Sequence, residues 1–340
     1  MNSYERVMTA LSHKEADRVP VFLFFTFYGA KELGVSIEEY FSKAENVASG
    51  QKRLLRKFGH DCVYAFFYAA LEAVAFGQEV EFYDDGPPNA GTPVLKNRDD
   101  IFTLKVPDPF KNKALAEAIK ATELLAAEYK KKVPVISAVV GPYSLPVMLM
   151  GMNNWLEIIV SGDTEAITAM TAKTSAFCLE WGNALFRAGA DAIGFFEPFA
   201  TTTMVRREEF IKYIYNYDKQ LISRFNGPVA FCGAGGRMEP IMDKICETGA
   251  AACALSVDDN LERIKNDFGG KINIIGNLNN ISMIDWTYDE AKKEAKKCLE
   301  NAKEGGGYIL ADQHGEISWP VTEDALRGIV DAAIEFGKYA

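Results

Sequence analysis

The sequence predicts an α/β protein that folds as a (β/α)8 barrel, the TIM barrel. Three observations support this fold class. Eight short apolar runs recur along the 340 residues, helical stretches separate them, and the length accommodates eight such repeats with an insertion. Parallel strands that are buried on both faces are apolar throughout, as these runs are. An open doubly wound sheet is the alternative, but no GxGxxG motif follows the first run.

The eight runs are the predicted strands, and they are taken here in chain order. They cover Val19–Phe25, Cys62–Phe67, Pro134–Val140, Ala192–Phe196, Val229–Cys232, Ala252–Val257, Ile272–Ile275 and Tyr308–Ala311. Helical spacing of apolar residues is clearest in the stretches Asn260–Asp267, Tyr288–Glu304 and Thr322–Tyr339. Thr322 before two acidic residues is typical of a helix N-terminus.

An insertion is expected between the second and third strands, consisting of a β-hairpin and a helix. The segments Glu79–Phe82 and Pro93–Lys96 flank the residues Asp-Asp-Gly-Pro-Pro, which favour a turn. No linker-like stretch divides the chain. We therefore expect one barrel domain over residues 1–340.

The composition excludes several classes of function. The formal net charge of −10 argues against a nucleic-acid partner and against an anionic membrane surface. No apolar run reaches the roughly 18 residues of a membrane-spanning helix. The first residues lack the apolar core of a signal peptide, and the six cysteines form no CxxC motif. These features predict a cytoplasmic protein with free thiols.

Barrel enzymes place their chemistry at the carboxyl ends of the strands, and three side chains of the types that bind metals follow predicted strands here. Glu197 follows the fourth predicted strand, Cys232 ends the fifth before a glycine-rich turn, and His314 follows the eighth. A carboxylate, a thiolate and an imidazole from different strands are sufficient for a three-ligand Zn²⁺ site with one open position. The alternative is that Cys232 only fills space in the core and that Glu197 only pairs with a helix N-terminus.

Aromatic residues are concentrated after the first two predicted strands. Most of them are expected in the core, and those beyond the strand tips are expected to form an apolar wall for a flat ligand. Asn277, after the seventh strand, either caps the next helix or binds a ligand. The residues assigned to substrate binding are Phe25, Phe27, Tyr28, Tyr68, Tyr143 and Asn277.

Seven segments, in this order along the chain, resemble the uroporphyrinogen decarboxylase superfamily. They read ERVMTALSHKEADRVPV, LEAVAFGQEVEF, VPDPF, VVGPYSL, AGADAIGFFEPFA, GNLNN and GGGYILADQHGEI. The resemblance covers nearly the whole chain and implies a (β/α)8 barrel. Decarboxylases of the family carry an arginine after the first strand and an aspartate after the second. Residues 24–30 here contain no arginine and residues 66–70 no aspartate, so binding of a tetrapyrrole with eight carboxylates is disfavoured.

The other branch of the superfamily, to which the chain is more similar, consists of corrinoid-dependent methyltransferases. Members that methylate coenzyme M bind zinc through His-x-Cys after the fifth strand and Cys after the eighth. Here Ala230 stands where the His of that motif would be, Cys232 keeps the Cys position, and His314 stands in the eighth-strand segment. The resemblance therefore implies zinc on Cys232 and His314, with Glu197 as the third ligand and Asp312 and Glu316 as rivals.

The function implied by this resemblance is zinc-assisted transfer of a methyl group between a corrinoid protein and a small molecule. The small molecule would be a methoxylated aromatic, an alcohol, an amine or a thiol such as coenzyme M. The corrinoid (methylcobamide) would come from a separate partner chain, because this sequence has no DxHxxG motif. Cys232, His314 and Glu197 would be the catalytic residues. Two alternatives remain, a decarboxylase acting on a tetrapyrrole and a non-catalytic barrel that binds one.

Overall fold

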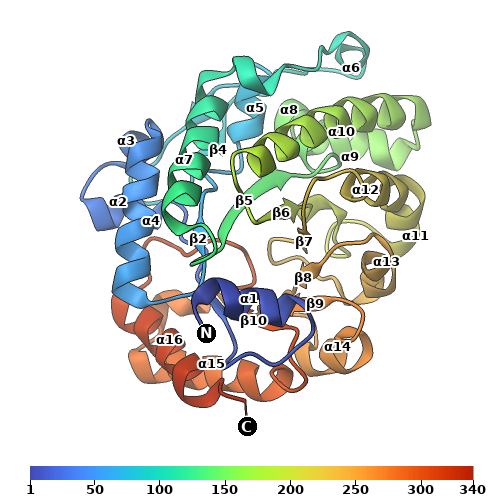
Figure 1. Cartoon of the computed structure of the whole chain (residues 1–340). Helices are drawn as coiled ribbons and strands as arrows, with labels where there is room; N and C mark the ends of the chain where they lie inside the picture. The colour runs from blue at the N-terminus through green and yellow to red at the C-terminus, as the bar shows by residue number, and fades with distance from the viewer. Residues whose placement is uncertain (340) are drawn as a thin grey trace.

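The computed structural model describes residues 1–339, and eight parallel strands form its central sheet. The strands are β1 (Val21–Phe22), β2 (Val63–Tyr64), β5 (Val135–Val140), β6 (Ala192–Phe196), β7 (Val229–Cys232), β8 (Ala252–Ala254), β9 (Asn273–Ile275) and β10 (Tyr308–Ala311). Their order in the sheet is β1-β10-β9-β8-β7-β6-β5-β2. Each predicted strand contains one observed strand, and the predicted TIM-barrel fold is confirmed. Figure 1 shows the strands at the centre of the molecule with the helices around them.

The helices surround the sheet in the alternating order that the sequence predicts. They are α1 (Ser3–Leu11), α2 (Tyr28–Leu33), α3 (Ile37–Phe41), α4 (Ala44–Phe58), α5 (Leu71–Ala75), α6 (Asp100–Thr103), α7 (Lys113–Tyr129), α8 (Leu145–Met150), α9 (Met152–Ser161), α10 (Thr164–Arg187), α11 (Arg207–Glu209), α12 (Tyr215–Ile222), α13 (Met242–Glu247), α14 (Leu261–Phe268), α15 (Tyr288–Ala302) and α16 (Glu323–Phe336). The helices predicted near 260, 288 and 322 are α14, α15 and α16. The side chain of Thr322 accepts a hydrogen bond from the Ala325 N–H, so its predicted role as a cap is confirmed.

A two-stranded antiparallel ribbon lies between β2 and β5. It pairs β3 (Val80–Glu81) with β4 (Asn89–Ala90). The prediction of Pro93–Lys96 as its second strand is wrong, because pairing begins directly after the turn and ends before Pro93. The Leu95 N–H instead donates to the carbonyl of Leu149, which ties this segment to α8.

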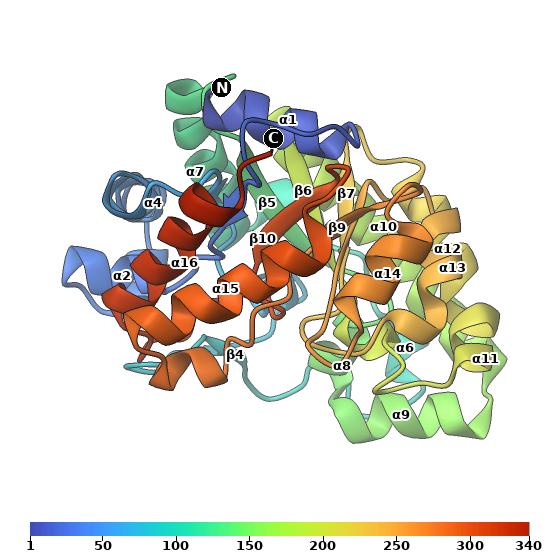
Figure 2. The same cartoon turned by 90° about the horizontal axis from the view of Figure 1, so that it is seen from below.

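Alternate residues of the strands face the inside and the outside of the barrel, as the two-residue period requires. The inner cluster includes Phe22, Phe24, Tyr64 and Cys232, and it is separate from the outer core beneath the helices. The α1 helix packs apolar side chains against the inner cluster and covers the amino-terminal end of the barrel. In Figure 2, α1 lies at one end of the strands, and α8, α9 and α11 extend beyond the other end.

The strands β1 and β2 are not paired by a ladder, and a glutamine from α4 connects them. The Gln51 side chain donates to the carbonyl of Phe25 (2.6 Å) and accepts from the Tyr64 N–H (2.9 Å). Gln51 is 1% exposed, so water does not compete for these bonds. The bridge fixes Phe24 and Tyr64 side by side at the carboxyl end of the barrel.

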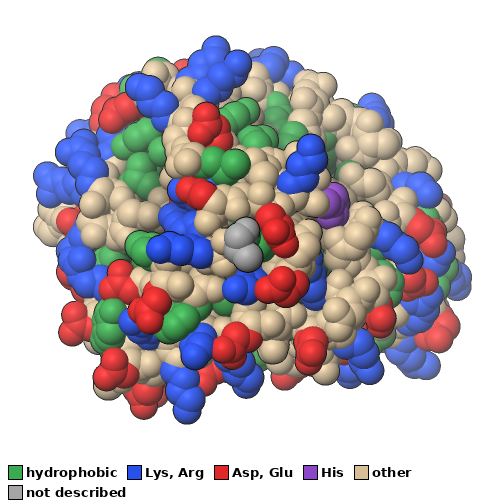
Figure 3. All heavy atoms as spheres, turned by 60° about the horizontal axis from the view of Figure 1, so that its bottom comes forward, with side chains coloured by type: hydrophobic (Ala, Val, Ile, Leu, Met, Phe, Trp, Pro, Cys, Tyr) green, Lys and Arg blue, Asp and Glu red, His purple; other side chains and the backbone are tan. Residues whose placement is uncertain are grey.

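Across residues 1–339, no helix is both long enough and apolar enough to cross a membrane. The six cysteines are all unpaired. On the face that Figure 3 shows, basic and acidic side chains are interspersed without a large area of one sign.

Candidate functional site

Four aromatic rings inside the carboxyl end of the barrel form what we call the ring layer: Phe24, Tyr64, Phe66 and Phe196. The centroids of Phe24 and Tyr64 are 5.4 Å apart, those of Tyr64 and Phe66 are 5.5 Å apart, and Phe66 stacks on Phe196 at 6.0 Å. Phe196 crosses to the opposite wall, since a Cβ added at Gly315 would lie 2.7 Å from its ring. The ring layer therefore spans the opening of the barrel from β1 to β6 and contacts the loop after β10.

Polar groups lie beside the ring layer at the same end. Cys232 ends β7 and is 3% exposed. One oxygen of Asp312 accepts the N–H groups of His314 (2.8 Å) and Gly315 (2.7 Å), while its other oxygen is buried without a partner. Glu316 accepts from the Thr26 hydroxyl at 2.8 Å. The Tyr64 hydroxyl is also buried without a partner.

Burial governs the ionisation of these groups. Burial raises the pKa of the Cys232 thiol to about 12, with a smaller contribution from the Asp312 charge, so the thiol is protonated at neutral pH. Burial likewise raises the pKa of Glu316 to about 7, and its bond from Thr26 opposes that shift. The pKa of Tyr64 is raised by burial and then by the nearby Cys232, Glu316 and Asp312 groups. These four side chains are therefore electrostatic neighbours.

Glu197 belongs to a different environment. It is fully buried, and its carboxylate accepts from the Tyr143 N–H (2.9 Å) and the Ser144 hydroxyl (2.5 Å) of the turn after β5. An added Cβ at Gly141 would lie 2.2 Å from the same carboxylate. Burial raises the pKa of Glu197, and also that of its neighbour Asp218. Glu197 thus joins the loops after β5 and β6 and does not reach toward Cys232.

The side chains present do not fit the expected zinc ion. Nowhere in residues 1–339 do three His, Cys, Asp or Glu side chains group so that they could hold a metal. Glu197 is bound to the turn after β5, the Cys232 thiol is buried, and His314 is exposed to solvent. The predicted set Glu197, Cys232 and His314 is therefore not brought together, and neither rival carboxylate, Asp312 or Glu316, completes it.

Three of the aromatic residues assigned to substrate binding pack outside the barrel opening. Phe25 is 0% exposed and contacts Phe58 of α4. Phe27 stacks on Trp319, and the hydroxyl of Tyr28 donates to the carbonyl of Val321 at 2.9 Å. These side chains belong to the outer core. Phe25 follows β1 at a position that points away from the barrel interior, and Phe27 and Tyr28 lie at the start of α2.

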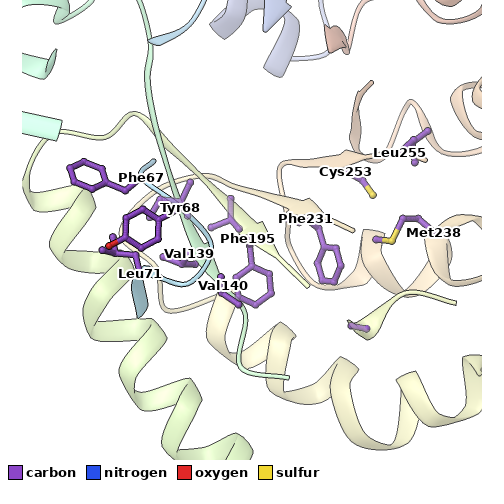
Figure 4. Packing of buried hydrophobic residues seen from close by; sticks show 14 of the residues in the cluster. Phe67, Tyr68, Leu71, Val139, Val140, Phe195, Phe231, Met238, Cys253 and Leu255 are labelled. Atoms are coloured by element: carbon purple, nitrogen blue, oxygen red, sulfur yellow. The ribbon is translucent and has the colours of Figure 1, made fainter. Parts of the chain in front are cut away.

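The other three assigned residues also lie away from the ring layer. Tyr68 packs edge-on against Phe41, and Figure 4 shows it among outer-core side chains near Leu71. Tyr143 is buried against Trp155. Asn277 donates to the carbonyl of Ser256 and lines a groove of about 640 Å³ between α14 and α15. The structure thus brings none of the six to the barrel opening.

The residues that do line the opening follow a regular spacing in the sequence. Phe22, Phe24, Tyr64 and Phe66 are spaced by two within their segments, as are Ala230 and Cys232. This period puts each set on one face of its strand. This alternation separates Phe24 from Phe25, because neighbouring residues of a strand point to opposite faces. The folded sheet then shows that Phe24 faces the barrel interior.

Comparison with known proteins gives one family match and several relatives. The family described as Uroporphyrinogen decarboxylase (URO-D) matches residues 2–336. Methylcobamide:CoM methyltransferase MtbA of Methanosarcina acetivorans is 27% identical, over 87% of this chain and 88% of that protein. A uroporphyrinogen decarboxylase of Trichlorobacter lovleyi is 24% identical, over 94% and 95%. A solved methyltransferase from Methanosarcina mazei superposes with a TM-score of 0.87 over 99% of both chains, at 18% identity.

Proposed function

Because the chain belongs to the uroporphyrinogen decarboxylase family, we propose that it is a methyltransferase of that family. In this proposal it moves a methyl group between the cobalt of a corrinoid protein and a small methylated compound. The observation that carries the proposal is the ring layer. The barrel opening offers aromatic rings and carboxyl groups, whereas a substrate with many carboxylates requires cations.

The relatives support the methyltransferase branch. The curated relatives in that branch are named methylcobamide:CoM methyltransferases, and one matches over 87% of this chain. The absence of an arginine in residues 24–30 and of an aspartate in residues 66–70 separates the chain from decarboxylases. A thiol acceptor such as coenzyme M is disfavoured, because the residues for a thiol-activating zinc do not converge.

The chain's own residues bind and orient the small compound in this proposal. The rings of Phe24, Tyr64, Phe66 and Phe196 surround its methyl-bearing end and keep water away from it. The Asp312 and Glu316 carboxyls fix its polar part. The cobalt, supplied by the partner, is the methyl acceptor or donor. No step is assigned to zinc, because Glu197, Cys232 and His314 do not fit a common ion.

Exposed apolar side chains after several strands support docking of a protein partner at this end. Met152, Met204, Val257 and Ile281 follow β5, β6, β8 and β9 respectively, and Ile281 is 70% exposed. Loops that follow parallel strands emerge at one end of a barrel. Exposed apolar groups gathered there are typical of a protein interface, and a corrinoid protein has to approach this end to present its cobalt.

The test uses free cob(I)alamin in place of the partner's corrinoid. The purified protein is mixed with it anaerobically and with one donor at a time from a set of methoxyarenes, methanol and methylated amines. Enzyme-dependent appearance of the methylcobalamin spectrum with at least one donor is the expected result. No methyl transfer with any donor would overturn the proposal, and decarboxylation of uroporphyrinogen would then favour the other branch.

A further inference from the structure

The barrel opening combines aromatic faces with uncompensated acidic groups. The four rings of the ring layer follow one another around it in the order Phe24, Tyr64, Phe66 and Phe196. The centroids of neighbouring rings are 5.4–6.0 Å apart. Ring faces carry negative charge density and attract cations, most strongly where water is excluded. An opening built only for an apolar ligand would not need acidic side chains beside these rings.

Two carboxyl groups and a phenol beside the rings are available for a ligand. Asp312 is 1% exposed, and its Oδ2 atom has no hydrogen-bond partner. The hydroxyl of Tyr64 is equally buried and equally unpartnered. Within residues 1–339 no lysine or arginine forms an ion pair with Asp312 or with Glu316, which is bound only by Thr26 among side chains. Buried polar atoms are nearly always satisfied in native proteins, so these unpartnered atoms indicate a missing partner.

We propose that the opening binds a methyl donor that carries a permanent positive charge, a quaternary ammonium compound. This inference rests on the proposed function and narrows its substrate class. The rings enclose the methyl groups around the charged nitrogen, and Asp312 and Glu316 supply the opposite charge. Aromatic enclosures with acidic neighbours are the arrangement that recognises such cations.

A quaternary donor also explains why the chain manages without converging metal ligands. A neutral ether or thioether leaves as an anion, which needs a proton or a metal ion. A quaternary ammonium group leaves as a neutral tertiary amine. In the transfer the carbon–nitrogen bond breaks and its electron pair stays on nitrogen, while a carbon–cobalt bond forms with the electron pair of cobalt(I). Cobalt is formally oxidised from Co(I) to Co(III), and no proton moves.

Phe66 and Phe196 are the rings that must move to admit such a group. Both are half-buried, whereas Phe24 and Tyr64 are fully buried. The cavity beneath Phe24 and Cys232 is small, about 50 Å³, and its lining is apolar, so it offers no polar group that would compensate a positive charge. The charged group therefore binds at the level of the ring layer, with the Phe66–Phe196 stack displaced toward solvent.

The binding test compares choline with 3,3-dimethylbutan-1-ol, which has a carbon atom in place of the charged nitrogen. Isothermal titration is expected to give at least tenfold tighter binding of choline. Glu316→Gln and Asp312→Asn are expected to weaken choline binding at least tenfold and to leave the neutral isostere within twofold. Asp258→Asn, a change at an exposed neighbouring acid, is the matched control. Equal affinity for the two compounds, or no effect of either site variant, would overturn the inference.

Asp312 also accepts backbone N–H groups, so Asp312→Asn is accepted only if its thermal unfolding matches the parent protein. If that variant does not fold, Glu316→Gln decides alone, because Glu316 accepts a single side-chain bond.

The activity arm separates this inference from the proposed function. With free cob(I)alamin, choline or tetramethylammonium is expected to yield methylcobalamin and the corresponding tertiary amine. Methyl transfer from methoxybenzene with none from the quaternary donors would keep the proposed function and overturn the inference. Selective choline binding without methyl transfer from any donor would support the cation site and overturn the proposed function.

Discussion

Glu72 provides a prediction whose size follows from the structure. It lies in the first turn of the short helix α5, is 0% exposed, and accepts the N–H of Val140, the last residue of β5, at 3.0 Å. Burial raises the pKa of Glu72 to about 7 from an ordinary 4.5. A carboxyl group whose pKa is raised by folding favours the folded state at low pH. Its contribution is complete below the unfolded pKa and is lost as the pH rises through the folded pKa.

This loss sets the expected effect of Glu72→Gln. From pH 5 to pH 8 the carboxyl group costs the folded state about 2–3 kcal/mol, taking about 1.4 kcal/mol per pH unit of pKa change. The glutamine keeps an oxygen for the Val140 N–H and does not ionise. Relative to the parent protein, the variant should therefore be nearly neutral at pH 5 and more stable by up to that amount at pH 8.

Urea unfolding at the two pH values measures this difference from the shift in midpoint at constant slope. Glu300→Gln, at an exposed position of α15, is the matched control and should show no pH-dependent gain. An equal effect of Glu72→Gln at pH 5 and pH 8 would refute the reasoning, since it would mean that the carboxyl group keeps its ordinary pKa in the fold.

Three further outcomes are expected. Gly141→Ala should lower the unfolding free energy by about 1–3 kcal/mol, because the added Cβ would lie 2.2 Å from the Glu197 carboxylate. Gly270→Ala is the control, since a Cβ added there would have no atom within 4 Å. Equal urea midpoints for the two variants would contradict the contact. Iodoacetamide at pH 8 should label half-exposed Cys246 well before Cys232, because burial raises the pKa of the Cys232 thiol to about 12. Peptide mass spectrometry follows the labelling of both cysteines, and similar rates would contradict the burial of Cys232. Ile281→Asp should raise the KM for a corrinoid protein at least tenfold while leaving turnover with free cob(I)alamin within twofold. A parent-like KM for the corrinoid protein would place Ile281 outside the docking surface.

The strands were predictable because each one is a continuous apolar run between polar turns. The predicted ranges follow the apolar runs and do not depend on the length of the hydrogen-bonded ladder. They therefore include β1 and β2, although these two strands are only two residues long. The second hairpin strand was misplaced because Val94 and Leu95 are apolar for a different reason. Leu95 is buried in the outer core and Val94 packs against that core, while the Leu95 N–H bonds to the last turn of α8. Apolar composition alone does not distinguish a strand from a loop that covers a helix.

The site was less predictable, because it depends on which face each side chain occupies. Choosing Phe25 in place of Phe24 moved the assignment from the barrel interior to the outer core, a difference of one residue. Glu197 was placed at the correct strand end, but its bonds to the turn after β5 are formed across 53 and 54 positions of sequence. Gln51, which holds Phe24 beside Tyr64, lies on a helix that no local pattern connects to the opening.

The central claim is that the ring layer is where the methyl group is transferred. The most direct measurement is the rate of methylcobalamin formation from free cob(I)alamin and the preferred donor in two Phe→Ala variants. Phe196→Ala alters the ring layer, and Phe110→Ala alters a ring that is 50% exposed on the surface. The account predicts at least a tenfold fall in kcat/KM for Phe196→Ala and parent-like values for Phe110→Ala. Parent-like kcat/KM in a folded Phe196→Ala protein would contradict it.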